Sequence, residues 1–305
     1  MKNLAKPENT IINSSFSWYI TGLVDGEGSF SIAISKNTSR SLGYIVSVSF
    51  EIALQASDKH ILLKLKEYFG VGGLYKHGED MYRYKVSSAK DIQNRVIPHF
   101  NKFPLQTQKG ADFYLFQQVI SIMTRGPLTP KDLQNIVNIK AVINRGLSST
   151  LKLAFPDTIP SSRPVIPFDR IPHPEWVRGF TEAEGCFFVT LMKNSYLRIG
   201  VQVTLGFILT QHSRDRDLLK GLVSFFGCGN YSERAMIGKA GDFKVSALKD
   251  ITQKIIPFFK EYPLLGAKIL SFKRLCLIAE IMEAKGHFSE EGLKKIKDIK
   301  SKSSL

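Results

Sequence analysis

The chain contains one short segment twice, and this repetition constrains its fold more than any other feature. Residues 20–28 read ITGLVDGEG and residues 177–185 read VRGFTEAEG, so both copies end in a glutamate followed by a glycine. Glu27 and Glu184 therefore occupy equivalent positions in two copies of one unit.

The similarity between the copies continues far beyond this segment. At a spacing of 157 residues other positions coincide, among them Asp58 with Asp215. After a two-residue insertion the spacing becomes 159, and a Pro-Leu pair followed by a lysine recurs at residues 104–109 and 263–268. Two copies are too few for a solenoid, so we expect a pair of similar domains related by a pseudo-twofold axis.

Composition limits the class of protein. A length of 305 residues with 43% hydrophobic content supports two ordinary cores. No apolar run approaches the roughly 20 residues that a membrane span needs, so we expect a soluble protein without a membrane partner. The formal net charge of +15 indicates a polyanionic partner, although charge alone also suits a basic protein that merely repels itself.

Two further features concern the compartment. The first ten residues, MKNLAKPENT, lack an apolar segment, so neither a signal peptide nor a transit sequence is expected. The three cysteines stand singly, which argues against a disulfide framework or a zinc site and favours a reducing compartment.

Each copy predicts the same order of elements. Residues 30–35 and 44–55 alternate apolar with polar side chains, which is typical of half-buried strands, and residues 81–86 continue the pattern. Helices are expected at 59–69 and 217–226. Each unit is thus predicted as helix, two strands, helix, two strands and further helices, with helices covering the apolar sheet face and the other face free for a ligand.

The two units are joined by a proline-rich segment. Residues 156–174 contain six of the thirteen prolines, which predicts a stiff extended linker. A helix at about 130–155 is expected before it, and a basic amphipathic stretch follows the second copy. The predicted boundaries are an N-terminal tail at 1–17, a first repeat at 18–140, a helix end and linker at 141–174, and a second repeat at 175–305.

Small residues on the two repeated segments predict close helix packing. Gly22 with Gly26, and Gly179 with Ala183, stand four positions apart and so leave a flat stripe on each helix. Two such helices can approach with their backbones nearly in contact. This arrangement would bring the ends of the two helices together.

An acid at each helix end is unfavourable unless a cation is present. Gly28 and Gly185 are predicted as C-terminal caps, so Glu27 and Glu184 would lie at the negative end of the helix dipole and repel each other. A divalent cation such as Mg²⁺ would remove this conflict, since helix ends also leave carbonyl oxygens unpaired.

The predicted metal ligands are all oxygens. The set comprises the carbonyl groups of Gly26 and Ala183 with the side chains of Glu27 and Glu184. Either two metal sites about 4 Å apart or one site shared between the acids would serve hydrolysis at phosphate. The alternative interpretation is a close-packed helix with a solvated acid, which the duplication disfavours.

Neighbouring polar residues are interpreted as structural. Asp25 and Glu182 also match between the copies, but they should face elsewhere, as polar ends or as partners of basic side chains. His60, His77 and His212 show no ligand spacing and are expected at the surface or in a groove.

The acid-glycine segments, their duplication, the alternating strands and the Pro-Leu-x-x-x-Lys segments together resemble the LAGLIDADG homing endonucleases. The similarity is to the single-chain form encoded within introns, often of fungal mitochondria, and it extends over nearly the whole chain. It implies an α+β fold of two pseudo-symmetric αββαββα repeats, with the two motif helices at their interface. Two antiparallel sheets would form a saddle over duplex DNA.

The resemblance also implies an activity. Such enzymes hydrolyse both DNA strands across the minor groove, and a groove about 6 Å wide brings the two scissile phosphates near adjacent acids. Two or three Mg²⁺ ions are implied at Glu27 and Glu184, where Mn²⁺ or Ca²⁺ can also bind. Lys109 and Lys268 match basic residues near the attacking water or the transition-state charge, with phosphate anchoring as the alternative role.

One position differs between the repeats. The second copy has Gln211 where the family often has glutamine at the end of the second strand, whereas the first copy has Leu54. Gln211 could orient a water molecule and Leu54 could not. We therefore expect the two DNA strands to be cut at unequal rates.

DNA readout should fall to outward strand positions. Arginine and glutamine suit base edges, while lysine more often contacts phosphate. Because the copies differ on these faces, we expect one monomer to bind a long non-palindromic duplex. The residues assigned to DNA binding are Lys36, Arg40, Arg83, Lys85, Lys193, Arg198, Gln202 and Lys244.

Two other functions remain open. The first is an RNA maturase that assists splicing of its host intron, with intron RNA as a further partner. The second is a DNA-binding protein without cleavage. Retention of both acids favours cleavage, and the resemblance implies a mitochondrial location.

Overall fold

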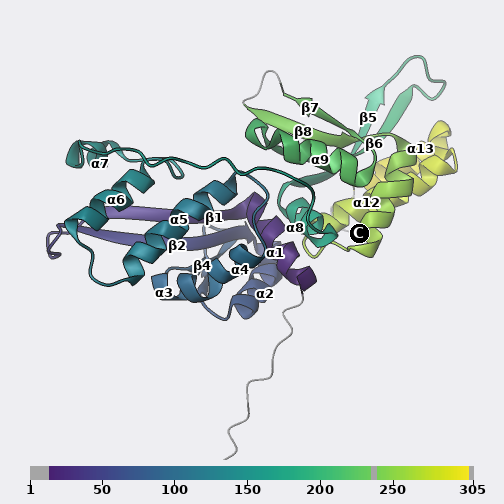
Figure 1. Cartoon of the computed structure of the whole chain (residues 1–305). Coiled ribbons are helices and arrows are strands. Elements are labelled where there is room, and N and C mark those ends of the chain that lie inside the picture. Colours follow the sequence, from purple (N-terminus) through teal and green to yellow (C-terminus); the bar gives the residue numbers. More distant parts are fainter. Residues whose placement is uncertain (1–13, 235–238, 302–305) are drawn as a thin grey trace, which may run out of the picture.

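The computed structural model describes residues 14–234 and 239–301 as two similar units on either side of a central pair of helices (Figure 1). The elements before the linker are α1 (Ser14–Glu27), β1 (Gly28–Lys36), β2 (Tyr44–Gln55), α2 (Lys59–Phe69), β3 (Gly73–Lys76), β4 (Met81–Val86), α3 (Ala89–Asp91), α4 (Ile97–Lys102), α5 (Lys109–Thr124), α6 (Pro130–Lys140) and α7 (Ser149–Ala154). Those after it are α8 (Pro174–Glu184), β5 (Gly185–Lys193), β6 (Val201–His212), α9 (Arg216–Phe226), β7 (Asn230–Glu233), β8 (Ala240–Val245), α10 (Leu248–Asp250), α11 (Ile256–Glu261), α12 (Lys268–Glu283) and α13 (Glu290–Ser301).

Each repeat is built on a four-stranded antiparallel sheet, as the alternating sequence predicts. The strand order is β1-β2-β4-β3 in the first repeat and β5-β6-β8-β7 in the second. The two orders are identical after renumbering, so the duplication in sequence is a duplication in structure. The expected α+β class of two pseudo-symmetric repeats is confirmed.

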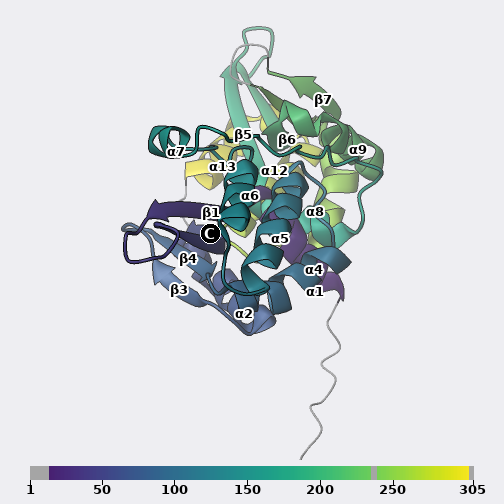
Figure 2. The ribbon, with the colours of Figure 1, turned by 60° about the vertical axis from the view of Figure 1, so that its left-hand side comes forward.

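Strand alternation directs one face of each sheet toward helices. In β2 the side chains of Val46, Val48, Phe50 and Ile52 are buried, and in β6 those of Val203, Leu205 and Phe207 are. These faces pack against α2, α4 and α5 in one repeat and against α9, α11 and α12 in the other (Figure 2). Each repeat therefore has its own hydrophobic core and a second sheet face without helices.

The expected polar character of that second face holds only in part. In the first sheet it carries serines and Glu51, as the sequence predicts. In the second sheet Cys186 and Met192 are exposed on it, with Met192 59% exposed. The two sheets therefore present different chemistry to a ligand.

The repeats meet through α1 and α8, which lie side by side at the centre of the molecule (Figure 1). A Cβ atom added to Gly22 would lie 2.0 Å from the carbonyl oxygen of Trp176. One added to Gly179 would lie 2.0 Å from that of Tyr19. The small residues are thus required because the two backbones are in contact, as predicted.

Gly28 and Gly185 follow the ends of the motif helices, as predicted, but neither adopts the left-handed conformation that is common in C-terminal caps. Gly185 has φ −76° and ψ 146°, and the chain passes directly from α8 into β5, as it does from α1 into β1 at Gly28. A Cβ atom on Gly28 would lie 2.4 Å from a side-chain carbon of Val24, and one on Gly185 2.5 Å from Thr181. The absence of a side chain, not a positive φ, is what this sharp turn requires.

The single helix predicted at 130–155 is also wrong. Helix α6 ends at Lys140 and α7 begins at Ser149, since Asn144 and Gly146 adopt positive φ values of 54° and 70°. The residues that follow, 155–173, contain no regular element, which agrees with the predicted extended linker. The linker runs from α7 back to α8 along one side of the first repeat (Figure 1).

Three smaller predictions concern the N-terminal tail, the cysteines and membrane-spanning segments. Helix α1 begins at Ser14, inside the range assigned to the N-terminal tail, and residues 1–13 lie outside the described residues. The three cysteines are free. None of the helices in the described part of the chain is long and apolar enough to cross a membrane.

Candidate active site

The two motif acids lie at the point where α1 and α8 end against each other. An ideal Cβ on Gly26 would lie 2.1 Å from the Cβ of Ala183 and 3.2 Å from the Cγ of Glu184. Glu27 is exposed, whereas Glu184 is half-buried. The packing of α1 against α8 therefore brings the C-terminal ends of the two motif helices together, as the spacing of small residues predicts.

One lysine from each repeat reaches the same place. The Nζ atom of Lys109 donates hydrogen bonds to the carbonyl oxygens of Val24 and Gly26, both at 2.7 Å. The Nζ atom of Lys268 donates to those of Thr181 and Ala183, at 3.2 and 2.6 Å. Both lysines begin their helices, and both bind carbonyl groups at the C-terminal end of the motif helix in their own repeat.

The charges at this point influence one another. Burial and the nearby charge of Glu27 raise the pKa of Glu184, although Lys109 and Lys268 oppose the shift. Burial lowers the pKa of both lysines, against the attraction of the surrounding acids. Acids with raised and bases with lowered pKa values in one place are typical of a functional site.

The residues present suit a divalent cation. Two carboxylates and two main-chain carbonyl groups form an all-oxygen donor set, which is the chemistry that Mg²⁺ and Ca²⁺ prefer. The carbonyl oxygens of Gly26 and Ala183 each accept from a lysine, yet a carbonyl oxygen has a second lone pair. Within residues 14–234 and 239–301 no three His, Cys, Asp or Glu side chains gather as a metal site, so carbonyls would have to contribute.

The second pair of matching acids has a role that the sequence interpretation missed. Asp25 is 1% exposed and accepts hydrogen bonds from the main-chain N–H groups of Gln106 and Thr107, from the Thr107 hydroxyl, and from Nε1 of Trp176. Glu182 accepts from the N–H groups of Leu265 and Gly266. These hydrogen-bond partners are N–H groups and a hydroxyl, not basic side chains, so the alternative of a basic partner is wrong, whereas a structural role is what the sequence predicts.

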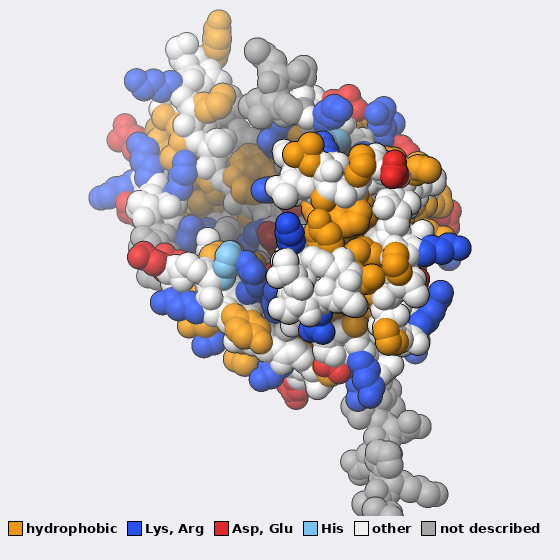
Figure 3. Space-filling model, turned by 90° about the vertical axis from the view of Figure 1, so that its left-hand side faces the viewer, with side chains coloured by type: hydrophobic (Ala, Val, Ile, Leu, Met, Phe, Trp, Pro, Cys, Tyr) orange, Lys and Arg blue, Asp and Glu red, His pale blue; other side chains and the backbone are white. Residues whose placement is uncertain are grey.

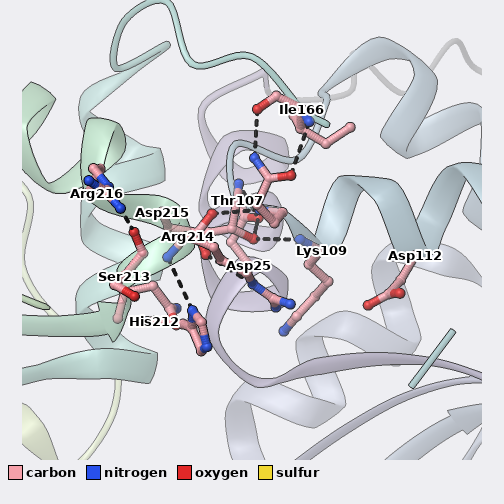
Figure 4. A network of polar contacts seen from close by, with 12 residues as sticks. Asp25, Thr107, Lys109, Asp112, Ile166, His212, Ser213, Arg214, Asp215 and Arg216 are labelled. Atoms are coloured by element: carbon pink, nitrogen blue, oxygen red, sulfur yellow. Dashed lines mark hydrogen bonds and ion pairs between the residues drawn. The ribbon is translucent and has the colours of Figure 1, made fainter. Parts of the chain in front are cut away.

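These acids hold the turn before each lysine helix. Figure 4 shows Asp25 beside Thr107 and the start of the helix that carries Lys109. Burial raises the pKa of Asp25, which its hydrogen bonds counteract. The signal in the sequence was the repetition itself, since a buried acid at a matching position needs a fixed donor in both copies.

Gln211 and Leu54 differ in the structure as they do in the sequence. Nε2 of Gln211 lies 3.4 Å from Oε1 of Glu184, so the glutamine reaches the paired acids. Leu54, at the equivalent place in β2, is 8% exposed and belongs to the core of the first repeat. The site is therefore asymmetric.

With this geometry in view, the comparison with known sequences is decisive. The sequence profile of the LAGLIDADG endonucleases matches the chain twice, over residues 20–120 and 177–279. The chain belongs to the LAGLIDADG endonuclease family. The expected family is thus confirmed, and its two matches coincide with the two structural repeats.

Relatives of this LAGLIDADG chain support the assignment. A probable intron-encoded endonuclease of Neurospora crassa is 36% identical over 284 residues, which are 92% of this chain and 52% of that protein. The chain thus spans about half the length of that relative. The structure matches I-SmaMI, a LAGLIDADG homing endonuclease bound to cleaved DNA, with a TM-score of 0.90, 36% identity and coverage of 93% and 95% of the two chains. It matches I-SmaMI bound to uncleaved DNA with calcium ions equally well, with a TM-score of 0.90, 37% identity and coverage of 93% and 97%.

The residues assigned to DNA binding lie at strand ends, in the turns that follow them and on the open sheet faces of the LAGLIDADG fold. Lys36 and Arg40 are exposed at the end of β1 and in the turn after it, and Lys193 and Arg198 occupy the matching places after β5. Lysine and arginine are more frequent than acids on the face seen in Figure 3, at the outer end of the first repeat. Gln202 is exposed on β6, where its Oε1 accepts from the side chain of Asn194.

Two of the assigned basic residues already have an acidic partner. Glu51 lies 2.9 Å from both Arg83 and Lys85 on the open face of the first sheet, and it also accepts from the hydroxyl of Ser49. Lys244, the counterpart of Lys85 in the second sheet, instead lies 5.6 Å from the ring centre of Phe188. The sequence pattern did not reveal the pairing with Glu51, because it links strands that are distant in the chain.

Proposed function

We propose that this chain is a site-specific double-strand DNA endonuclease that hydrolyses phosphodiesters across the minor groove of a long non-palindromic site. The observation that carries the proposal is the meeting of two acids and two lysines at the ends of α1 and α8. Each half of that cluster comes from one repeat, so each repeat can act on one strand. The membership of the family and the DNA-bound neighbours support the same reaction.

The donor set would hold divalent metal, with Mg²⁺ as the physiological ion and Mn²⁺ or Ca²⁺ as substitutes. Glu27 and Glu184 would bind two or three ions together with the carbonyl groups of Gly26 and Ala183. When bound, the metal would lower the pKa of water and stabilise charge on the attacking and leaving oxygens. The calcium in the I-SmaMI complex supports a divalent requirement.

The protein groups act around that metal. Lys109 and Lys268 would place a positive charge where negative charge develops on phosphate, in a half-buried setting that strengthens the interaction. Gln211 would orient a water molecule at one strand. Glu184, whose pKa burial raises, is held ionised in part by the same two lysines.

The open faces of the two sheets would bind the duplex. Exposed basic side chains would contact phosphate and fix the register, whereas Gln202 and the arginines would read base edges. The set proposed is Lys36, Arg40, Arg83, Lys85, Lys193, Arg198, Gln202 and Lys244. Because both repeats belong to one chain, a monomer would cover both halves of the site.

The biological setting follows from the relatives. An intron-encoded relative in a fungus supports an origin in an intron. We propose that this intron is mitochondrial and that the protein acts on DNA inside mitochondria. A maturase role with intron RNA would need an RNA surface, and the presence of both acids and both lysines in the two repeats favours cleavage over it.

The test is cleavage of a supercoiled plasmid library of intron-free host DNA, with Mg²⁺ or with EDTA, followed by sequencing of the ends. We expect Mg²⁺-dependent breaks at one long site. The double variant Glu27→Gln with Glu184→Gln should bind that site and not cut it. The matched control, Glu67→Gln with Glu283→Gln, changes the net charge equally at two exposed acids and should cut normally.

Two results would contradict the proposal. Cleavage by the double variant at the rate of the control would remove the acids from the reaction. Binding of DNA without any nicking, over a library shown to contain the bound site, would leave a DNA-binding protein, and preferential binding of intron RNA would favour the maturase.

A further inference from the structure

The turn before each lysine helix offers three consecutive N–H groups, and two carboxylates bind them in the same way in both repeats. In the first repeat Asp25 accepts from Gln106 and Thr107, and the third group is that of Gln108. In the second repeat Glu182 accepts from the first two groups, and the third is that of Ala267. The first acid always comes from the motif helix of the same repeat.

The second acid always comes from the other repeat. Oδ1 of Asp215 accepts from the N–H of Gln108 at 2.7 Å, and Oδ1 of Asp58 accepts from that of Ala267 at 2.7 Å. Asp58 and Asp215 are equivalent positions, so each repeat contributes one aspartate to the turn of the other repeat in the same way. We call these two hydrogen bonds the exchanged contacts. Figure 4 shows Asp215 reaching from the second repeat toward Thr107 and Lys109 of the first.

These contacts supply an anion at helix starts with little local capping: the hydroxyl of Thr107 accepts from the N–H of Lys109 at 3.2 Å in the first repeat, and Gly266 at the matching place in the second repeat has no side chain. Gln108 and Ala267 are the residues that precede α5 and α12, and neither makes a side-chain capping bond. Uncapped N–H groups at a helix start favour an anionic partner, both as hydrogen-bond donors and through the helix dipole. The two aspartates supply this charge next to Lys109 and Lys268, the first residues of those helices.

Each aspartate also ends a strand-turn segment of its own repeat. Asp58 and Asp215 close the short 3₁₀ turns Ala56–Asp58 and Ser213–Asp215, which follow β2 and β6 directly. Asp215 is 5% exposed, and burial raises its pKa. The contact therefore joins the sheet of one repeat to the lysine helix of the other.

The two exchanged contacts are not supported equally. The side chain of Gln108 also binds the linker, with Nε2 donating to the carbonyl oxygen of Ile166 and Oε1 accepting from its N–H. Ala267 has no such side chain. On its side, Nε2 of His60 donates to the carbonyl oxygen of Leu265 at 2.8 Å, but His60 itself stands on the same segment as Asp58.

We infer that Asp58 and Asp215 are positioning residues that each fix the position of the lysine in the opposite repeat. Asp58 would position Lys268, and Asp215 would position Lys109. The inference rests on the proposed function for its catalytic consequence. Each strand would then be cut by a site that both repeats assemble, which couples the two cleavage events to correct docking of the repeats.

The experiment compares four variants on a duplex with its two strands labelled differently. Lys109→Met and Lys268→Met first define which strand each lysine serves. Asp58→Ala should then slow only the strand that Lys268→Met slows, by at least about tenfold, since small misplacements of a reacting group have effects of this order. Asp215→Ala should slow the other strand less, because the linker still holds Gln108.

Two controls separate positioning from stability. Asp132→Ala removes a capping carboxylate from α6, where Asp132 and Thr129 form a capping box, and it should lower the melting temperature without any strand bias. Asp58→Asn keeps one acceptor oxygen and serves if the alanine variant does not fold. Combining Asp58→Ala with Lys268→Met should cut no more slowly than Lys268→Met alone.

A second readout does not depend on cleavage. Amide hydrogen exchange in Asp58→Ala should rise at residues 265–270, in the opposite repeat, and stay unchanged at 106–111. Unchanged exchange at 265–270, equal slowing of both strands, or slowing of the strand served by Lys109 would each overturn the inference. Absence of cleavage by the unaltered protein would instead refute the proposed function, and the exchange result would still decide the positioning.

Discussion

The Nζ atom of Lys268 lies 2.6 Å from the carbonyl oxygen of Ala183, on the last turn of the motif helix α8. Lys109 makes the same contact with Gly26 at the end of α1. Each lysine thus places a cation at the negative end of a helix dipole, where a carboxylate also stands. Two helix ends and two acids concentrate negative charge in one place. The two lysines compensate part of this charge and so reduce the electrostatic repulsion in the metal-free site.

The two lysines compensate the negative charge of Glu184 only in part. We therefore predict that Glu184→Gln stabilises the metal-free protein. The pKa of Glu184 is raised by burial first and by Glu27 next, so its charged form is less favourable in the folded state than in the unfolded one. The folded state gains stability from this group as pH falls through the raised pKa, and that gain is complete below 4.5. At neutral pH the neutral variant should therefore melt a few degrees higher, measured by calorimetry.

The same variant should lose its response to metal. Added Mg²⁺ stabilises a folded protein that binds it, so the melting temperature of the unaltered protein should rise with Mg²⁺ and that of Glu184→Gln should not. The advantage of the variant should also shrink as pH is lowered toward 4.5. A lower melting temperature for the metal-free variant at neutral pH would contradict the electrostatic account, and Glu283→Gln is the exposed control.

A second prediction concerns the asymmetry between Gln211 and Leu54. We expect the unaltered protein to accumulate nicked plasmid, because only one repeat places an amide beside the acids. Gln211→Leu should slow the faster strand by about tenfold and so reduce the nicked intermediate. The measurement is the time course of nicked and linear plasmid.

A matched control lies on the same strand. Gln202→Leu alters an exposed glutamine of β6 that points away from the acids, so it should affect binding and leave the ratio of strand rates unchanged. Equal nicking rates of the two strands in the unaltered protein would show that Gln211 has no such role.

The sequence predicted what depends on local periodicity and on repetition. Strand alternation located the helix-facing residues of β2 and β6, and glycine spacing predicted the contact of α1 with α8. The exchanged contact of Asp58 with Ala267 joins positions 209 residues apart, and no local pattern contains it. Gly28 and Gly185 lack the left-handed conformation common in helix caps because a helix followed by glycine can also turn directly into a strand, and tertiary packing decides between the two.

A third prediction concerns Glu51 on the open face of the first sheet. Glu51 holds Arg83 and Lys85, and its charge repels phosphate at the same place. Glu51→Gln should therefore tighten binding to non-specific DNA several-fold at low salt. The slope of log affinity against log salt should become steeper by about one for each cation that newly contacts phosphate.

Fluorescence titration over a range of salt concentrations measures both quantities. Glu67→Gln, an exposed acid on α2, makes the same change of net charge on the helical side and should leave the slope unchanged. An equal effect of the two variants would show that Glu51 acts only through net charge and does not restrain Arg83 and Lys85.

The last prediction concerns the helix pair that brings the two halves of the site together. Gly22→Ala would place a methyl group 2.0 Å from the carbonyl oxygen of Trp176, a main-chain atom that cannot rotate away. The helices would have to separate, at a cost of about 3 kcal/mol. Denaturant unfolding should show this loss, and cleavage of both strands should fall together because the acids would move apart.

Gly43→Ala tests whether the effect comes from the contact and not from losing a glycine. Gly43 has φ +70° and no atom within 4 Å of an added Cβ, so its substitution costs only backbone strain, about 1–2 kcal/mol. Cleavage by Gly43→Ala should remain normal at temperatures where it is folded. If Gly22→Ala unfolded no more easily than Gly43→Ala and still cut both strands, the close approach of α1 and α8 would not be what assembles the site.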